Sequence, residues 1–174
     1  SLVGSEMCIR DSNDIHPENF SIALANSLSN NGGYITQLVF GNGGVRVNAS
    51  NEFLYSTPQT IGRTASLYNE TYYKVVDQHS ITDNLEKTRN YMTVSHVTGN
   101  VYSDILVHCT LEKGEPTEQN VLNNDSQIIS EYTFSEVGLR TSKGDLITHI
   151  CHYPISKTSN ITLVFDYLLR IQIV

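Results

Sequence analysis

The sequence lacks tryptophan and carries few charges, which make up 17% of its 174 residues. Its 18 acidic and 11 basic residues give a net charge of −7, and Lys and Arg form no cluster. Proteins that bind nucleic acids usually carry a basic stripe, so we expect no nucleic-acid partner. The acidity also disfavours attachment to anionic membrane surfaces. No apolar run approaches the roughly 20 residues that a membrane-spanning helix needs.

Cysteine is scarce as well, with only Cys8, Cys109 and Cys151. An odd number without a closely spaced pair excludes a disulfide framework and a zinc ribbon. Cys109 and Cys151 lie in strand-like segments, where we expect small buried core residues. A reducing compartment is the default expectation.

Residues 1–12 read SLVGSEMCIRDS and resemble translated sequencing-adapter read-through. They lack the basic start and apolar core of a signal peptide. We leave them out of the fold prediction; the alternative is a genuine, disordered tail. Residues 13–174 are long enough for a single domain with its own core.

A helix is predicted over residues 14–30, before the Asn-Asn-Gly-Gly stop at 30–33. Asp14 can cap this helix, and Pro17 suits its first turn. The apolar residues that recur at helical spacing are Phe20, Ala23, Leu24 and Leu28. This face should pack on a sheet or on a partner chain.

The rest of the chain is dominated by strand patterns and turns. Strands are predicted at residues 34–40, 45–47, 91–97, 101–111, 128–139, 146–153 and 161–174. Residues 67–76 fit a strand or a short helix, residues 48–66 a long ordered loop or arm, and residues 112–126 an exposed loop. Hairpin turns are predicted at 41–44, 98–100 and 142–145. The fold class is therefore mainly β, an antiparallel sandwich or barrel-like sheet with one N-terminal helix.

Two strands have informative side-chain patterns. Between Phe134 and Val137 the apolar positions shift by one residue, which predicts a β-bulge. Pro154 should end the strand that begins at Leu146. In residues 161–174 every odd position is apolar, which predicts a long strand with one buried face and a paired neighbour on both sides.

Candidates for chemistry are sparse. His149 and Cys151 share a face of a strand, and His108 or His96 would have to supply a third metal ligand. Histidines that hydrogen-bond their neighbours are the alternative, so we predict no metal and no cofactor. Gly41-Asn42-Gly43-Gly44 lacks the Lys of a phosphate loop and is better explained as a turn. Asp104, Glu131 and Glu136 occupy ordinary strand or turn positions, so we predict that the chain is not an enzyme.

Two longer segments resemble virion proteins of bacteriophages. Residues 35–44 and 67–72 follow the layout of a strand, G-x-G, a polar loop with Pro, and L-x-x-E in tail and collar-fibre proteins. Residues 132–139, a turn at 144–145 and residues 146–154 resemble a hairpin of those families, and residues 167–173 also fit. The chain differs from the pattern of these families at Arg140, where an aromatic residue is common, and it lacks their long fibrous C-terminal extension.

The resemblance implies a structural subunit of a tailed phage particle, in the tail, neck or collar, baseplate or connector, assembled in the bacterial cytoplasm. Its partners would be other virion proteins and copies of itself. We expect contacts through Phe20, Leu24, Leu28, Tyr68 and Tyr72. The alternatives are a capsid decoration protein or a virion-surface module that binds a host receptor or glycan, which the ten tyrosines would suit.

Overall fold

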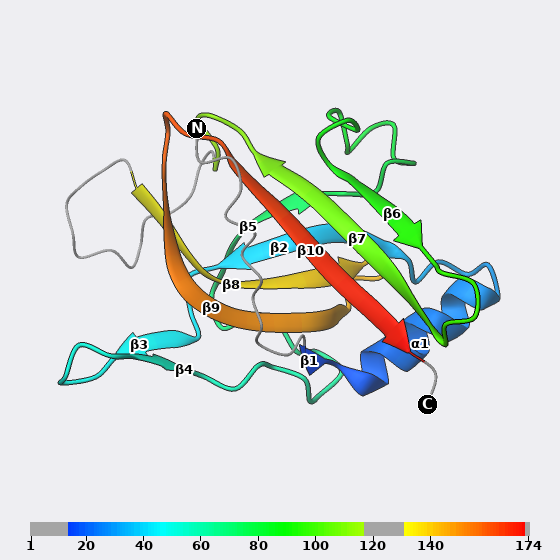
Figure 1. Cartoon of the computed structure of the whole chain (residues 1–174), viewed down its shortest axis with the longest axis horizontal. Helices are drawn as coiled ribbons and strands as arrows, with labels where there is room; N and C mark the ends of the chain where they lie inside the picture. The colour runs from blue at the N-terminus through cyan, green and yellow to red at the C-terminus, as the bar shows by residue number, and fades with distance from the viewer. Residues whose placement is uncertain (1–13, 117–130, 173–174) are drawn as a thin grey trace.

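The computed structural model describes residues 14–116 and 131–172, and in these ranges the chain forms two antiparallel sheets packed face to face and a separate two-stranded sheet, β3-β4 (Figure 1). The five-stranded sheet has the order β1-β9-β8-β2-β5, and the three-stranded sheet the order β10-β7-β6. The strands are β1 Asp14–Ile15, β2 Ile35–Gly41, β3 Val45–Val47, β4 Phe53–Tyr55, β5 Glu70–Val75, β6 Tyr91–Ser95, β7 Tyr102–Leu111, β8 Glu131–Thr141, β9 Leu146–Thr158 and β10 Leu163–Gln172. The predicted fold class is confirmed as a sandwich-like arrangement, with no closed barrel among these strands.

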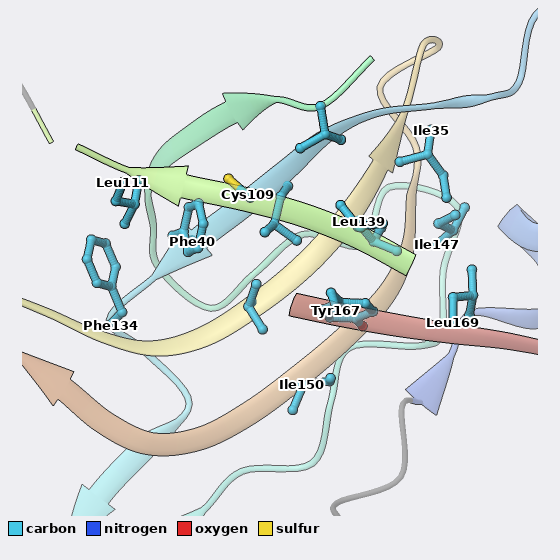
Figure 2. Close-up of a cluster of buried hydrophobic side chains, with 14 of the residues drawn as sticks. Ile35, Phe40, Cys109, Leu111, Phe134, Leu139, Ile147, Ile150, Tyr167 and Leu169 are labelled. Carbon is cyan, nitrogen blue, oxygen red and sulfur yellow. The ribbon is translucent and has the colours of Figure 1, made fainter. Parts of the chain in front are cut away.

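The core lies between the two sheets (Figure 2). The five-stranded sheet contributes Leu38, Phe40, Val137, Leu139 and Ile150, and the facing sheet contributes Val107, Cys109, Leu111, Tyr167 and Leu169. All are buried. Cys109 is thus the small core residue that its strand pattern predicts.

Strand β10 keeps the predicted alternation, because its odd positions face the core and its even positions face outward. Its neighbour is β7, paired from Leu163 with Leu111 to Gln172 with Tyr102. The prediction of a partner on both sides is wrong for the described strands, since β10 ends its sheet. The opposite sheet shields the apolar face, so burial requires no second neighbour.

The predicted bulge in β8 is confirmed by a register shift between Phe134 and Glu136. Strand β9, however, does not end at Pro154 but runs on to Thr158. Phe134 pairs with Ile155 and Glu136 with Cys151, so Pro154 falls within the irregular stretch between these pairs. A proline is tolerated there because the bulge needs no ladder hydrogen bond from it.

The glycine run at 41–44 does not form the predicted hairpin between β2 and β3. Strand β2 pairs with β5 and β8, whereas β3 pairs with β4. The predicted arm at 48–66 therefore includes β4, and the β3–β4 hairpin extends beside the two sheets (Figure 1). Residues 67–76, left open between strand and helix, contain strand β5.

Helix α1, Pro17–Leu28, is shorter than predicted and is capped by His16, whose Nδ1 accepts the Asn19 N–H. Asp14 does not cap it, because Asp14 lies in β1 opposite His149. Asn19 and Ala23 are the buried residues of the helix. No helix in the described ranges is long and apolar enough to cross a membrane.

Candidate functional site

Three buried side chains that could carry chemistry meet on the outer face of the five-stranded sheet. Glu136 of β8 lies opposite Cys151 of β9, and His149 lies two residues away on β9. His149 Nε2 is 2.9 Å from a carboxylate oxygen of Glu136 and 3.8 Å from Cys151 Sγ. His149 and Cys151 share a face as predicted, and Glu136 joins them there. We call these three residues the polar cluster.

Main-chain amides surround the Glu136 carboxylate. Its Oε1 accepts the N–H groups of Gly43 at 3.1 Å and Asn69 at 2.7 Å, and its Oε2 accepts the N–H of Tyr68 at 2.9 Å. A Cβ on Gly43 would come within 2.9 Å of Oε1. The glycine-rich run therefore wraps an internal carboxylate, which explains why it makes no tight turn back along β2.

Gly44 completes this close packing. Its φ of +73° lies in the left-handed region that favours glycine, and an added Cβ would meet Cys151 Sγ at 2.5 Å. The segment that follows β2 thus approaches β9 more closely than a residue with a side chain could. This segment and the amides of Tyr68 and Asn69 cover the polar cluster.

The hydrogen bonds of His149 fix which ring nitrogen carries a proton. The Gln59 main-chain N–H donates to His149 Nδ1 at 2.7 Å, so Nδ1 offers a lone pair. The proton of the neutral ring therefore sits on Nε2 and is donated to Glu136. The ring joins the loop at Gln59 to strand β8.

The acid–base properties of the cluster follow from these contacts. Burial raises the pKa of Glu136, but hydrogen bonds from His149, Asn69 and Tyr68 outweigh it, and the net pKa is lowered. Burial and the charge of Glu136 raise the pKa of Cys151 to about 12. The cluster thus combines an ionised carboxylate, a neutral imidazole and a neutral thiol, and a thiol in this state is a poor nucleophile.

The three ligand atoms lie within 4.8 Å of one another, a spacing that could hold a metal ion. Coordination through His149 Nε2 would require the proton to leave that nitrogen. A neutral metal-bound ring would then carry its proton on Nδ1, where Gln59 already donates. Glu136 would also lose one of its four donors. These contacts favour a structural role for the polar cluster over a metal centre.

The structure does not bring His108 or His96 to the cluster. His108 lies on β7 in the other sheet, contacts Asp166 at 2.6 Å and stacks on Tyr91. His96 is exposed and contacts the Tyr102 carbonyl at 3.0 Å. The suggestion that either could complete a metal site with His149 is wrong, because His108 lies on β7 and His96 directly follows β6, and both strands belong to the sheet that packs on the opposite face of the five-stranded sheet.

The predicted contact residues lie in different environments. Leu28 of α1 is 80% exposed and Leu24 is 44% exposed. Tyr68 is also exposed, and its hydroxyl donates to the Thr57 carbonyl. Phe20 and Tyr72 are only half-buried, and Tyr72 packs against the core.

Sequence reasoning missed the central residue of the site. Glu136 was expected at an ordinary strand or turn position, yet it is fully buried. Its four donors come from residues 43, 68, 69 and 149, which are distant in the sequence. The one available signal was the pair of glycines at 43 and 44, since close approach to another chain segment is a common reason for such glycines.

Comparisons with known proteins identify no relative. No protein-family model matches the sequence, and neither a curated protein nor a solved structure matches at a significant level.

Proposed function

We propose that the chain is a structural subunit of a tailed bacteriophage particle and acts through contacts with other virion proteins and with copies of itself. The observation that carries this proposal is the β3–β4 hairpin, which extends beside the two sheets (Figure 1). We call it the arm, defined as residues 45–55. An isolated two-stranded ribbon is marginally stable by itself in water, so an arm of this kind gains most from a neighbouring chain.

The arm has an apolar surface and a defined anchor. Val47 is 55% exposed and Tyr55 is 47% exposed. Phe53 packs edge-on against Tyr153 of β9, with ring centroids 4.8 Å apart, and so fixes the base of the arm. Exposed apolar side chains on a projecting hairpin suit insertion into the surface of a neighbouring subunit.

The polar cluster supports a role without chemistry on a substrate. The Glu136 carboxylate accepts four hydrogen bonds, and both ring nitrogens of His149 are engaged. Catalysis needs a group that can exchange its partner with a substrate. Here these partners hold the loop between β2 and β5 against the sheet.

Assignment to a phage particle rests on the sequence resemblance. The segments that carry it contribute to β2, β5, β8 and β9, which are adjacent strands of the larger sheet, and to β10 of the smaller sheet. Closed assemblies are commonly built from β-sheet subunits that contact their symmetry-related neighbours through arms.

The test is to measure the protein content of gradient-purified particles of a tailed phage whose genome encodes the chain. Quantitative mass spectrometry should find the chain in several copies per particle, in a fixed ratio to the major capsid protein. Its absence from purified particles, together with its presence in the infected-cell lysate, would contradict the proposal.

A further inference from the structure

A second surface, separate from the arm, lies along strand β5. A groove with a volume of about 1280 Å³ is lined by Tyr72, Tyr73, Lys74 and Val75 and by residues of the loop between β5 and β6. Alternate residues of a strand face opposite sides of its sheet. Because four consecutive residues of β5 line the groove, it includes the edge of this strand, and Thr36 and Gln37 show that it also reaches β2.

The edge of β5 is open in the described structure. Strand β5 ends the order β1-β9-β8-β2-β5, and its pairing partner is β2. Within the described ranges, no hydrogen bond from the loop at 77–90 reaches the main chain of residues 72–75. A strand edge of this kind presents N–H and C=O groups that can pair with another extended chain.

The walls of the groove carry an excess of negative charge. Lys74 Nζ contacts the Glu115 carboxylate at 2.9 Å and a Glu86 oxygen at 3.5 Å. Asp77 and Asp83 also line the groove, so four carboxylates face one ammonium group and three negative charges remain. Such a wall selects a cationic partner by charge complementarity.

Two tyrosines lie at the same surface. Tyr34 and Tyr73 line the groove and are each about half exposed. The Arg140 guanidinium lies 5.6 Å from the centre of the Tyr73 ring, so one tyrosine already receives a cation on its face. Tyrosine rings next to carboxylates are favourable contacts for Lys and Arg side chains.

We propose that this groove binds an extended, Lys- or Arg-rich segment of a partner protein, which adds to the five-stranded sheet as a sixth strand beside β5. Its main chain pairs with the open edge, and its cationic side chains place their charges against the exposed carboxylates of Glu86 and Asp83. The inference names a kind of partner for the proposed protein-contact function and rests on that function, but not on the arm or on membership of a phage particle.

The probe is a short blocked peptide in which Lys and Thr alternate, titrated into the full-length, isotope-labelled chain. Amide signals of residues 72–75 should shift, and hydrogen exchange should slow at the alternate N–H groups of this stretch that do not bond to β2. The apparent Kd should rise with added salt, because exposed charges provide part of the attraction. A peptide that leaves residues 72–75 unchanged would overturn the proposal.

Two peptide controls separate strand pairing from simple charge attraction. A peptide of the same Lys–Thr sequence with every main-chain nitrogen methylated keeps the charge, but it has no N–H donor and its methyl groups block pairing on both edges, so it should not slow exchange at β5. A peptide that alternates Glu and Thr should not bind. Equal binding of either control would overturn the proposal, as would binding of a neutral oligosaccharide in the groove in place of the Lys–Thr peptide.

The matched variants are D83K/E86K and E18K. Asp83 and Glu86 are exposed, and their reversal should weaken peptide binding at least about fivefold without loss of the folded amide spectrum. Glu18 lies in the first turn of α1, away from the groove, and its reversal should change the Kd by less than about twofold. An unchanged Kd in D83K/E86K would overturn the proposal. Oligomer mass is measured separately, so failure of the peptide test is distinguishable from failure of the proposed function.

Discussion

His149 donates its Nε2 proton to the Glu136 carboxylate across 2.9 Å, and both side chains are completely buried. The two residues lie on adjacent strands, and through Gln59, Tyr68 and Asn69 they also bind the loop between β2 and β5. In this position the carboxylate accepts hydrogen bonds from four protein donors instead of from water. It therefore adds polar contacts to the apolar packing of Leu67 on Val39 and Leu146, which also holds this loop against the sheet.

The first prediction concerns Glu136→Gln, which keeps the size of the side chain but removes its charge. The new amide would turn an N–H₂ group toward main-chain donors that now bind a carboxylate oxygen. We expect the free energy of unfolding to fall by about 3 kcal/mol, since buried donors lose their acceptor. Urea unfolding measures this change, and a loss below about 1 kcal/mol would show that the carboxylate is not central.

The second prediction compares Gly44→Ala with Gly99→Ala. Both glycines have positive φ, +73° and +95°, but only Gly44 faces Cys151 at close range, whereas Gly99 has nothing near its missing Cβ. Both variants should lose about 1 kcal/mol from backbone strain, and Gly44→Ala should lose about 2 kcal/mol more from the contact. The double variant Gly44→Ala/Cys151→Ala should recover part of this extra loss. Equal losses in the two single variants would contradict the close-packing account.

The third prediction concerns acid. Burial lowers the pKa of His152 below its ordinary value of 6.5, despite an opposing hydrogen bond to the Tyr153 carbonyl. Below pH 6.5 the unfolded chain takes up this proton before the folded chain does, so stability falls as the pH falls, by at most about 1.4 kcal/mol per pH unit for one proton. Below pH 4.5 the lowered pKa of Glu136 adds a second loss, because its carboxylate is stabilised only when folded.

Urea unfolding at several pH values measures both steps. In His152→Leu the slope just below pH 6.5 should be smaller than in the wild type, while the loss below pH 4.5 should remain. An unchanged slope in this variant would contradict the role assigned to His152.

Much of the fold could be predicted because its signals are local. The alternation in β10 and the phase shift in β8 each follow from a few neighbouring side chains. The pairing of β3 could not be predicted, because the glycines that precede it pack against Glu136 instead of forming a hairpin turn. The prediction that the strand ends at Pro154 was wrong for a similar reason, because only the register between β8 and β9 shows that Pro154 lies in a bulge.

Only part of the candidate site could be predicted from the sequence. His149 and Cys151 share a face by simple alternation. Glu136 could not be assigned to the same place, because a charged residue in a strand usually faces water. Its burial depends on main-chain donors in a loop whose path is set by tertiary contacts.

The fourth prediction concerns zinc. Because Gln59 donates to Nδ1 of His149, we expect equimolar Zn²⁺ to change the melting temperature by less than about 1 °C. Differential scanning fluorimetry with and without a chelator measures this change. A stabilisation of several degrees that disappears in Cys151→Ser would instead establish the polar cluster as a metal centre.

The most direct measurement for a role in protein contacts is the mass of the full-length chain in solution, determined by light scattering during size-exclusion chromatography. The account predicts a defined multiple of the 19.4 kDa monomer, reduced in Val47→Asp/Tyr55→Asp on the arm but not in Ile61→Asp, which removes an exposed apolar residue outside it. A wild-type chain that stays monomeric at high concentration, or a mass that does not respond to the arm variant, would contradict it.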